Sequence, residues 1–155
     1  MFNIHIIAVG KLKESYWKEA EAEYLKRLSP YAKIRITELK EESFQSTKER
    51  TEVQKKEAAK IIKAVEDGST LIVLHERGKE MTSEQMATML EKKSEQGSTL
   101  TFVIGGPLGL DETIVQNADV QLSLSTLTFP HNMVRTILIE QVYRSVMIGK
   151  GKYHY

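Results

Sequence analysis

Short apolar segments alternate with amphipathic segments along the whole chain. Residues 3–9, 71–74 and 100–104 are predominantly apolar runs of strand length, residues 33–39 alternate apolar and charged positions, and residues 120–124 also have strand length. An alternating run is typical of a half-exposed edge strand, and a mostly apolar run is typical of a strand that is covered on both faces. The pattern therefore predicts buried strands at 3–9, 71–74 and 100–104, a half-exposed edge strand at 33–39, and a further strand at 120–124.

Helical spacing of apolar residues predicts a helix between each pair of strands and one after the last. These helices are expected at about 15–28, 52–66, 82–97, 111–117 and 132–148. Ser15 is expected to cap the first helix, and Thr82 and Gln85 have the spacing of a capping box. Residues 41–51 are polar and without a period, which predicts a mobile loop.

Alternation of strands and helices favours an α/β fold with a mainly parallel sheet and helices on both faces. A chain of 155 residues fits a single domain, 1–155. In such folds, ligands bind outside the carboxyl ends of the strands. This rule indicates three places: after Leu74, after Ile104 and after Leu124.

The segment after Ile104 is glycine-rich and reads GGPLGL over residues 105–110. Glycine lets a ligand approach the backbone closely. The spacing is neither that of a Walker loop nor that of a dinucleotide-binding GxGxxG turn. A nucleotide-like ligand and a plain strand-to-helix turn both remain open from the spacing alone.

Residues 124–131 form a loop that combines hydroxyl groups with apolar side chains, in the sequence LSTLTFPH. Loops this apolar normally pack against something. Hydroxyls and backbone groups among apolar side chains suit an adenine pocket. Packing of the loop on its own domain is an equal alternative.

Charge and composition limit the classes of partner. The net charge is +1, so RNA binding would need a local basic patch, and one candidate lies at the C-terminus, which bears Arg135, Arg144, Lys150 and Lys152 against the single acid Glu140. A solvated helix face is the alternative. There is no cysteine, the four histidines have no metal-ligand spacing, and no apolar run reaches membrane-spanning length. We expect no metal, no membrane and a cytoplasmic location.

The last helix is apolar over far more of its surface than one stripe, from Met133 to Met147. A helix that packs on one side of a sheet needs an apolar stripe only slightly wider than about 100°. A two-fold partner is the simplest cover for the excess, which predicts a homodimer. Glu140 and Arg144 are spaced to form a salt bridge along this helix.

Ordered motifs along the chain carry a resemblance to a known family. They are AVGKLK at 8–13, VIGGPLGL at 103–110, LSLS at 122–125, TFPH at 128–131, VR at 134–135, EQVYR at 140–144 and YH at 153–154. Together they resemble the RlmH family of SPOUT-class methyltransferases, which modify a pseudouridine of large-subunit ribosomal RNA. The resemblance covers the whole chain.

The resemblance implies a C-terminal trefoil knot that binds S-adenosylmethionine, and a homodimer with its active site across the interface. It also implies methyl transfer to N3 of a pseudouridine in helix 69 of 23S rRNA, on assembled ribosomes. The contacts to S-adenosylmethionine would be Leu74, Gly105, Leu124, Ser125, Thr126, Leu127, Thr128 and Phe129.

The resemblance and the chemistry of the side chains also suggest roles near the C-terminus. His154, Tyr153 and Arg144 are the expected catalytic residues, with His154 as a base or RNA-positioning group and Tyr153 as a stacking ring. The expected RNA contacts are Arg135, Arg144, Lys150 and Lys152. Two other functions stay open: a methyltransferase acting on transfer RNA, and a non-catalytic dimer that binds RNA or a nucleotide.

Overall fold

The computed structural model describes residues 1–153, and its centre is a five-stranded sheet in which every pair of neighbouring strands is parallel. The strand order is β2-β1-β4-β3-β5. The strands are β1 (Phe2–Val9), β2 (Ala32–Leu39), β3 (Thr70–Glu80), β4 (Leu100–Ile104) and β5 (Val120–Ser123). The prediction of an α/β fold with a parallel sheet is confirmed, and β2 is the expected edge strand.

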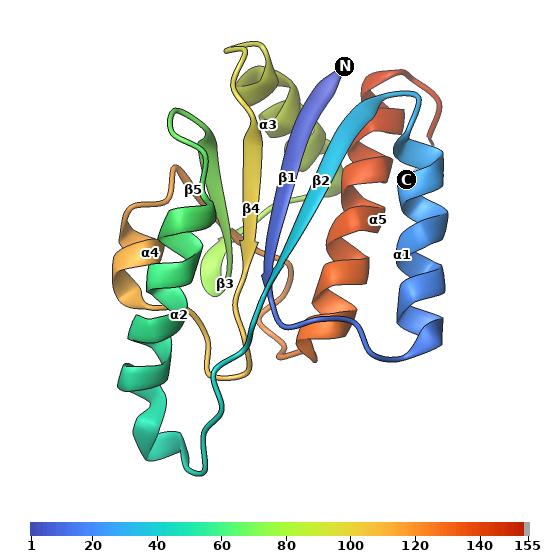
Figure 1. Cartoon of the computed structure of the whole chain (residues 1–155). Coiled ribbons are helices and arrows are strands. Elements are labelled where there is room, and N and C mark those ends of the chain that lie inside the picture. The colour runs from blue at the N-terminus through green and yellow to red at the C-terminus, as the bar shows by residue number, and fades with distance from the viewer. Residues whose placement is uncertain (154–155) are drawn as a thin grey trace.

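Helices cover both faces of the sheet (Figure 1). One face carries α1 (Ser15–Leu28), α3 (Ser83–Ser94) and α5 (His131–Gly149), and the other carries α2 (Arg50–Ala64) and α4 (Glu112–Gln116). Each face of the sheet has its own hydrophobic core, and residues of β1 point to the two cores in alternation. Ile4 and Ile6 lie in the core with α5, whereas Ile7 and Val9 lie in the core with α2. Within residues 1–153, no helix is long and apolar enough to cross a membrane.

Three local predictions need correction. The segment 41–51 contains a short 3-10 helix (Thr47–Glu49) with Ser46 and Glu49 as its capping box, and α2 already begins at Arg50. β3 continues to Glu80 beyond the expected end at Leu74. Ser15 is the first helical residue rather than the cap, since Glu14 holds that position without a side-chain hydrogen bond. The capping box of Thr82 and Gln85 is confirmed.

α5 lies between α1 and α3 and runs from the carboxyl edge of the sheet to the amino edge (Figure 1). Its 19 residues span about 28 Å. Its inner side is buried through Leu138, Ile139 and Val142, but Met133 and Ile137 are only partly covered. The helix therefore keeps apolar surface that the other residues of 1–153 do not cover.

His5 on β1 is a buried histidine that is held in its neutral form. Arg35 donates from Nη2 to His5 Nδ1 at 3.1 Å, so the ring proton sits on Nε2 and is donated to Thr37 Oγ1 at 2.8 Å. Burial lowers the pKa of His5, and the positive charge of Arg35 lowers it further. The ring thus resists protonation in the folded chain.

This lowered pKa predicts a loss of stability in mild acid. Below about pH 6.5 the unfolded chain binds a proton at residue 5 more readily than the folded chain does, so the free energy of unfolding falls as the pH falls. Replacing the imidazole in His5→Gln should remove this part of the pH dependence. Urea midpoints of wild type and variant at about pH 7.5 and 5.5 measure it, and equal pH dependence of the two proteins would contradict the prediction.

Candidate functional site

The carboxyl ends of β3, β4 and β5 meet at one edge of the sheet. Val73 pairs with Val103, and Leu74 pairs with Leu122. Neighbouring strands lie about 4.8 Å apart, so the irregular part of β3 after Leu74 and the loops after β4 and β5 are adjacent. The structure therefore brings together Leu74, Gly105 and the segment 124–129, as expected from the strand order of an α/β sheet.

Hydrogen bonds join the loop after β5 to the segment after Leu74. The hydroxyl of Ser123 lies 3.1 Å from the carbonyl oxygen of Glu76 and 3.0 Å from that of Ser125. Thr128 Oγ1 donates to the carboxylate of Glu76 at 3.2 Å, and the backbone N–H of Leu127 donates to Ser125 Oγ at 3.0 Å. These contacts fix a loop that otherwise has no regular structure.

An irregularity in β3 makes this junction possible. β3 pairs with β5 up to Leu74, breaks register, and pairs again with β5 through Lys79 and Glu80. Gly78 lies in the break, where a Cβ atom would stand only 2.6 Å from the carbonyl oxygen of Gln121. A side chain at position 78 would push β3 and β5 apart, so glycine is needed here for close approach.

The glycine-rich loop after β4 is held mainly by its backbone. Gly109 has φ of +82° and donates its N–H to the carbonyl oxygen of Gly106 at 3.0 Å. The carbonyl oxygen of Leu108 accepts from Gln54 Nε2 at 2.7 Å and from Arg50 Nη1 at 3.1 Å. A Cβ at Gly105 would lie 2.9 Å from Leu110 Cγ. The loop is therefore compact at Gly105 and anchored to α2.

Glu57 is a buried residue at this edge that the sequence reasoning missed. It is 3% exposed, lies next to Gly106, and accepts the backbone N–H of Glu42 at 3.0 Å. Burial raises the pKa of its carboxyl group, although the hydrogen bond from Glu42 opposes the shift. A signal was present: Glu57 lies four residues from both Val53 and Ile61, within the apolar stripe of α2.

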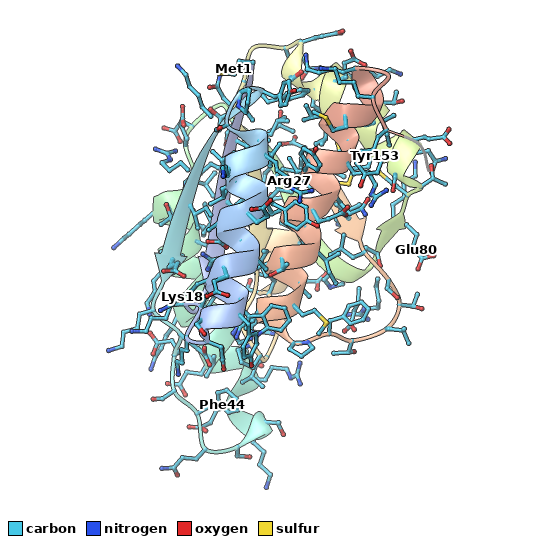
Figure 2. All side chains as sticks on the ribbon, turned by 90° about the vertical axis from the view of Figure 1, so that its right-hand side faces the viewer. Met1, Lys18, Arg27, Phe44, Glu80 and Tyr153 are labelled. Carbon is cyan, nitrogen blue, oxygen red and sulfur yellow. The ribbon has the colours of Figure 1, made fainter. Side chains whose placement is uncertain are left out.

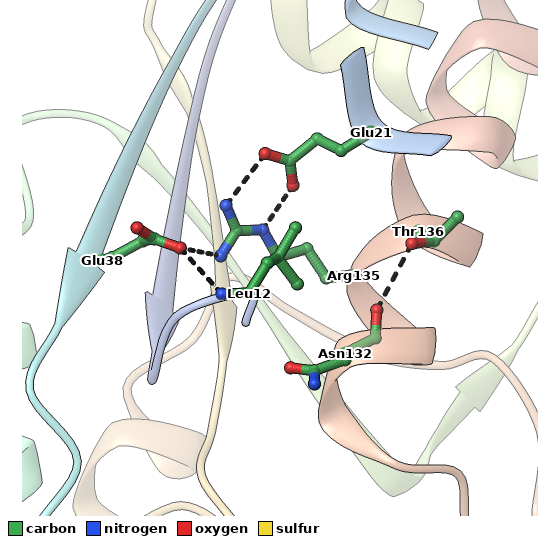
Figure 3. Close-up of polar contacts among 6 residues, drawn as sticks. All are labelled: Leu12, Glu21, Glu38, Asn132, Arg135 and Thr136. Atoms are coloured by element: carbon green, nitrogen blue, oxygen red, sulfur yellow. Dashed lines mark hydrogen bonds and ion pairs between the residues drawn. The ribbon is translucent and has the colours of Figure 1, made fainter. Parts of the chain in front are cut away.

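Arg135 is not placed as an RNA contact, contrary to the sequence interpretation. It is 5% exposed, and its guanidinium lies between two carboxylates (Figure 3). Nη2 donates to Glu21 at 2.9 Å, and Nη1 donates to Glu38 at 2.7 Å. Burial lowers the pKa of Arg135, but the hydrogen bonds to both carboxylates outweigh it and the net shift is upward. The positive charge of Arg135 is balanced by these two carboxylates, and its side chain links α5 to α1 and β2.

Tyr153 and Arg144 lie together against the C-terminal half of α5. The Arg144 guanidinium carbon is 4.4 Å from the centroid of the Tyr153 ring, and Arg144 also binds Glu140 at 2.6 Å, which confirms the predicted helical salt bridge. That hydrogen bond raises the pKa of Arg144. Figure 2 shows Tyr153 toward the end of the molecule that carries Met1 and away from Phe44. His154 lies outside the described residues.

Lys150 and Lys152 are exposed at the amino edge of the sheet. Their Nζ atoms lie 5.0 Å and 5.9 Å from the centroid of the Tyr31 ring, and Tyr31 immediately precedes β2. The segment of β3 after Leu74 and the loops after Ile104 and Leu124 lie at the opposite, carboxyl edge. Within one chain, the C-terminal residues and the three loops are therefore separated by most of the length of α5.

A separate cleft of about 560 Å³ lies between the end of β3 and α3. Three lysines line it, Lys79, Lys92 and Lys93, together with the acid Glu84 and the apolar Met81 and Met89. Lys79 pairs with Leu122, so the cleft borders the loop after β5. It adds positive charge on the side of the sheet that carries α3 and α5.

Comparison with known proteins identifies the family. A family model described as predicted SPOUT methyltransferase matches residues 2–154. The chain belongs to the SPOUT methyltransferase family. A relative from Acetivibrio thermocellus, named ribosomal RNA large subunit methyltransferase H, is 48% identical over 156 residues, which cover 97% of this chain and 98% of the relative.

A solved structure supports the fold of this SPOUT chain independently of close sequence similarity. It is a probable methylase family protein from Haemophilus influenzae Rd KW20, 14% identical, with a TM-score of 0.53. The match covers 96% of this chain and 66% of that chain. Among residues 1–153, no group of three His, Asp or Glu side chains is arranged to hold a metal ion.

The position of Arg135 predicts a structural effect of its removal. Arg135→Met leaves the largely buried Glu21 carboxylate without its partner, and breaking a buried pair in this way costs roughly 3 kcal/mol in the free energy of unfolding. Arg27→Met is the matched control, because its pair with Glu23 is half exposed and on the surface of α1. Urea denaturation measures both variants, and an equal effect in the two would contradict the buried role of Arg135.

Proposed function

We propose that this protein is an S-adenosylmethionine-dependent methyltransferase of large-subunit ribosomal RNA that methylates N3 of a pseudouridine in helix 69 of the assembled ribosome. The observation that carries the proposal is the 48% identity, over 97% of the chain, to a relative named ribosomal RNA large subunit methyltransferase H. The arrangement of the three loops at the carboxyl edge supports it. The proposed site of action is the cytoplasm, where ribosomes lie.

The residues at the three loops fit the methyl donor. Leu74, Leu124 and Phe129 are half-buried, and Leu127 is 68% exposed, so apolar surface is available to cover an adenine ring. At Gly105 a Cβ would stand 2.9 Å from Leu110 Cγ, so glycine there permits the compact course of the loop that would border the donor. The remaining proposed donor contacts are Ser125, Thr126 and Thr128. A trefoil knot that threads this segment belongs to the same proposal.

Methyl transfer requires the protein to position the target base and to help remove its N3 proton. Bound S-adenosylmethionine supplies a methyl group that is already activated by the sulfonium. The chain must hold the N3–H of the target ring in line and help its proton leave. Tyr153 offers a ring for stacking, Arg144 holds that ring by a cation–π contact, and His154 is the proposed base.

The distance between the C-terminal residues and the donor loops supports a two-fold dimer. Arg144 lies 13 positions after the start of α5, which is about 20 Å along the helix from the donor edge. An antiparallel partner packed on the uncovered side of α5 would bring its own Tyr153 to that edge. The partly exposed Met133 and Ile137 provide apolar contact for such a partner.

Exposed lysines provide the charge for RNA. Lys150 and Lys152 stay in the proposed RNA surface, Arg144 contributes beside Tyr153, and Arg135 is excluded because it is buried. Among the cleft lysines, Lys79 pairs with Leu122 of β5, and Lys92 and Lys93 lie in the last turn of α3. Local clusters of this kind are sufficient for phosphate contacts in a chain whose net charge is only +1.

Methylation of ribosomes tests the function directly. The purified protein is incubated with labelled S-adenosylmethionine and either ribosomes that lack the modification or transfer RNA, and the label is mapped. We expect label at N3 of the helix 69 pseudouridine and none on transfer RNA. Label on transfer RNA alone would replace the proposed substrate, and donor binding without label on any RNA would leave a binding protein instead of an enzyme.

Mixed dimers test whether the site is shared between two copies. One variant, Tyr153→Ala with His154→Ala, lacks the C-terminal groups, and the other, Gly105→Val, is checked by calorimetry to have lost donor binding. Each is expected to be inactive alone. After mixing, about a quarter of wild-type activity should return, because half the dimers are mixed and each retains one complete site. No recovery, despite exchange of subunits, would contradict the shared site.

A further inference from the structure

α2 presents three polar side chains to the glycine-rich loop from one helical face. Arg50, Gln54 and Glu57 follow one another at intervals of four and three residues. The first two donate to the carbonyl oxygen of Leu108, at 3.1 Å and 2.7 Å. Glu57 lies against Gly106, where a Cβ would stand 3.2 Å from its Oε1 atom. The loop that follows β4 is therefore anchored to α2 by the hydrogen bonds of Arg50 and Gln54.

Burial of the Glu57 carboxylate is unfavourable for the stability of the fold. A carboxylate that is 3% exposed loses most of its hydration, and among the ion pairs of residues 1–153 none includes Glu57. Its neighbours on the same side of α2, Val53, Ala58 and Ile61, belong to the apolar core. A leucine or methionine would satisfy the packing at lower cost. The carboxylate therefore needs an explanation other than stability.

The contacts of Glu57 join two segments that are far apart in sequence. One oxygen accepts the N–H of Glu42, in the connection between β2 and α2, and the other faces Gly106. Lys60 strengthens the first attachment, since its Nζ binds Glu42 at 2.7 Å and the carbonyl oxygen of Lys40 at 2.8 Å. The absence of a side chain at Gly106 leaves room for the carboxylate. Glu57 thus holds the segment at Glu42 by a hydrogen bond and packs beside Gly106 of the glycine-rich loop.

We propose that Glu57 is a positioning residue for the methyl donor, and that its carboxylate sets the path of the loop at Gly106 and so the shape of the donor pocket. This inference rests on the proposed function, because it assumes that S-adenosylmethionine binds at Gly105 and the adjoining loops. Glu57 acts through the loop and does not touch the reacting atoms.

Donor binding in four proteins tests the proposal: wild type, Glu57→Ala, Glu57→Gln and the control Glu52→Gln. Glu52 lies on the same helix, and its side chain is 69% exposed and paired with Lys56. By calorimetry with S-adenosylmethionine, we expect the Ala variant to bind about tenfold or more weakly and Glu52→Gln to bind as wild type does. The Gln variant should recover part of the loss, because its amide oxygen can still accept from Glu42.

Two further readouts separate positioning from a general loss of stability. In the free protein, hydrogen exchange at residues 105–110 should accelerate in Glu57→Ala, while exchange in α1 stays unchanged. In methylation assays the KM for S-adenosylmethionine should rise, with kcat at saturating donor unchanged. If Glu57→Ala fails to fold, the Gln variant is tested against wild type by the same three measurements.

The outcomes distinguish this proposal from the proposed function. Wild type that binds donor, together with folded Glu57 variants that bind it equally well, would overturn the positioning role and leave the methyltransferase intact. A fall in kcat without a rise in KM would also overturn it. Wild type that binds no S-adenosylmethionine would overturn the proposed function, and the role of Glu57 would fall with it.

Discussion

The parallel direction of all five strands is the constraint on which the rest of the molecule depends. Parallel strands place every carboxyl end at the same edge, so the segments after Leu74, Ile104 and Ser123 must meet there. The same direction requires a crossover between successive strands, which puts helices on both faces and buries both sides of β1 and β4. The candidate site is therefore a consequence of strand direction, with local chemistry added by the loops.

The same constraint fixes the edge of the sheet at which α5 ends. α5 begins at the carboxyl edge, beside the loop that follows β5, and its length carries Lys150 and Lys152 to the amino edge. Arg135 holds the first turns of this helix to α1 and β2 through Glu21 and Glu38. A helix so anchored cannot bring Tyr153 back to the donor loops of its own chain. In the proposed dimer a second copy resolves this separation, and the remaining apolar surface of α5 is consistent with that.

Much of the fold could be predicted from the sequence because the apolar runs at 71–74 and 100–104 are short and nearly uninterrupted, which is typical of buried parallel strands. The loops at Gly105 and Leu124 followed from strand direction alone. The continuation of β3 to Glu80 could not be predicted in this way, because residues 75–80 are mostly polar and pair with β5 only after a break at Gly78. The apolar pattern of a sequence indicates which residues are buried, whereas this pairing of β3 with β5 depends on backbone geometry.

Arg135 and Glu57 show a second kind of structural feature that could not be predicted from the sequence. Both are charged, and charge alone favours solvent or a ligand, but each is buried because partners from distant parts of the chain surround it. Glu21 and Glu38 lie 114 and 97 residues from Arg135, a separation that no local pattern encodes. The position of Glu57 in an apolar stripe was a readable signal of burial, whereas its contact with Gly106 was not.

A crystal structure with S-adenosylhomocysteine, the product of the donor, tests the account most directly. The account predicts that the ligand lies between residues 105–110 and 124–129, beside Leu74, with Tyr153 of the partner subunit at the same edge. A ligand bound in the lysine-lined cleft between β3 and α3, or a two-fold contact that leaves α5 uncovered, would contradict it.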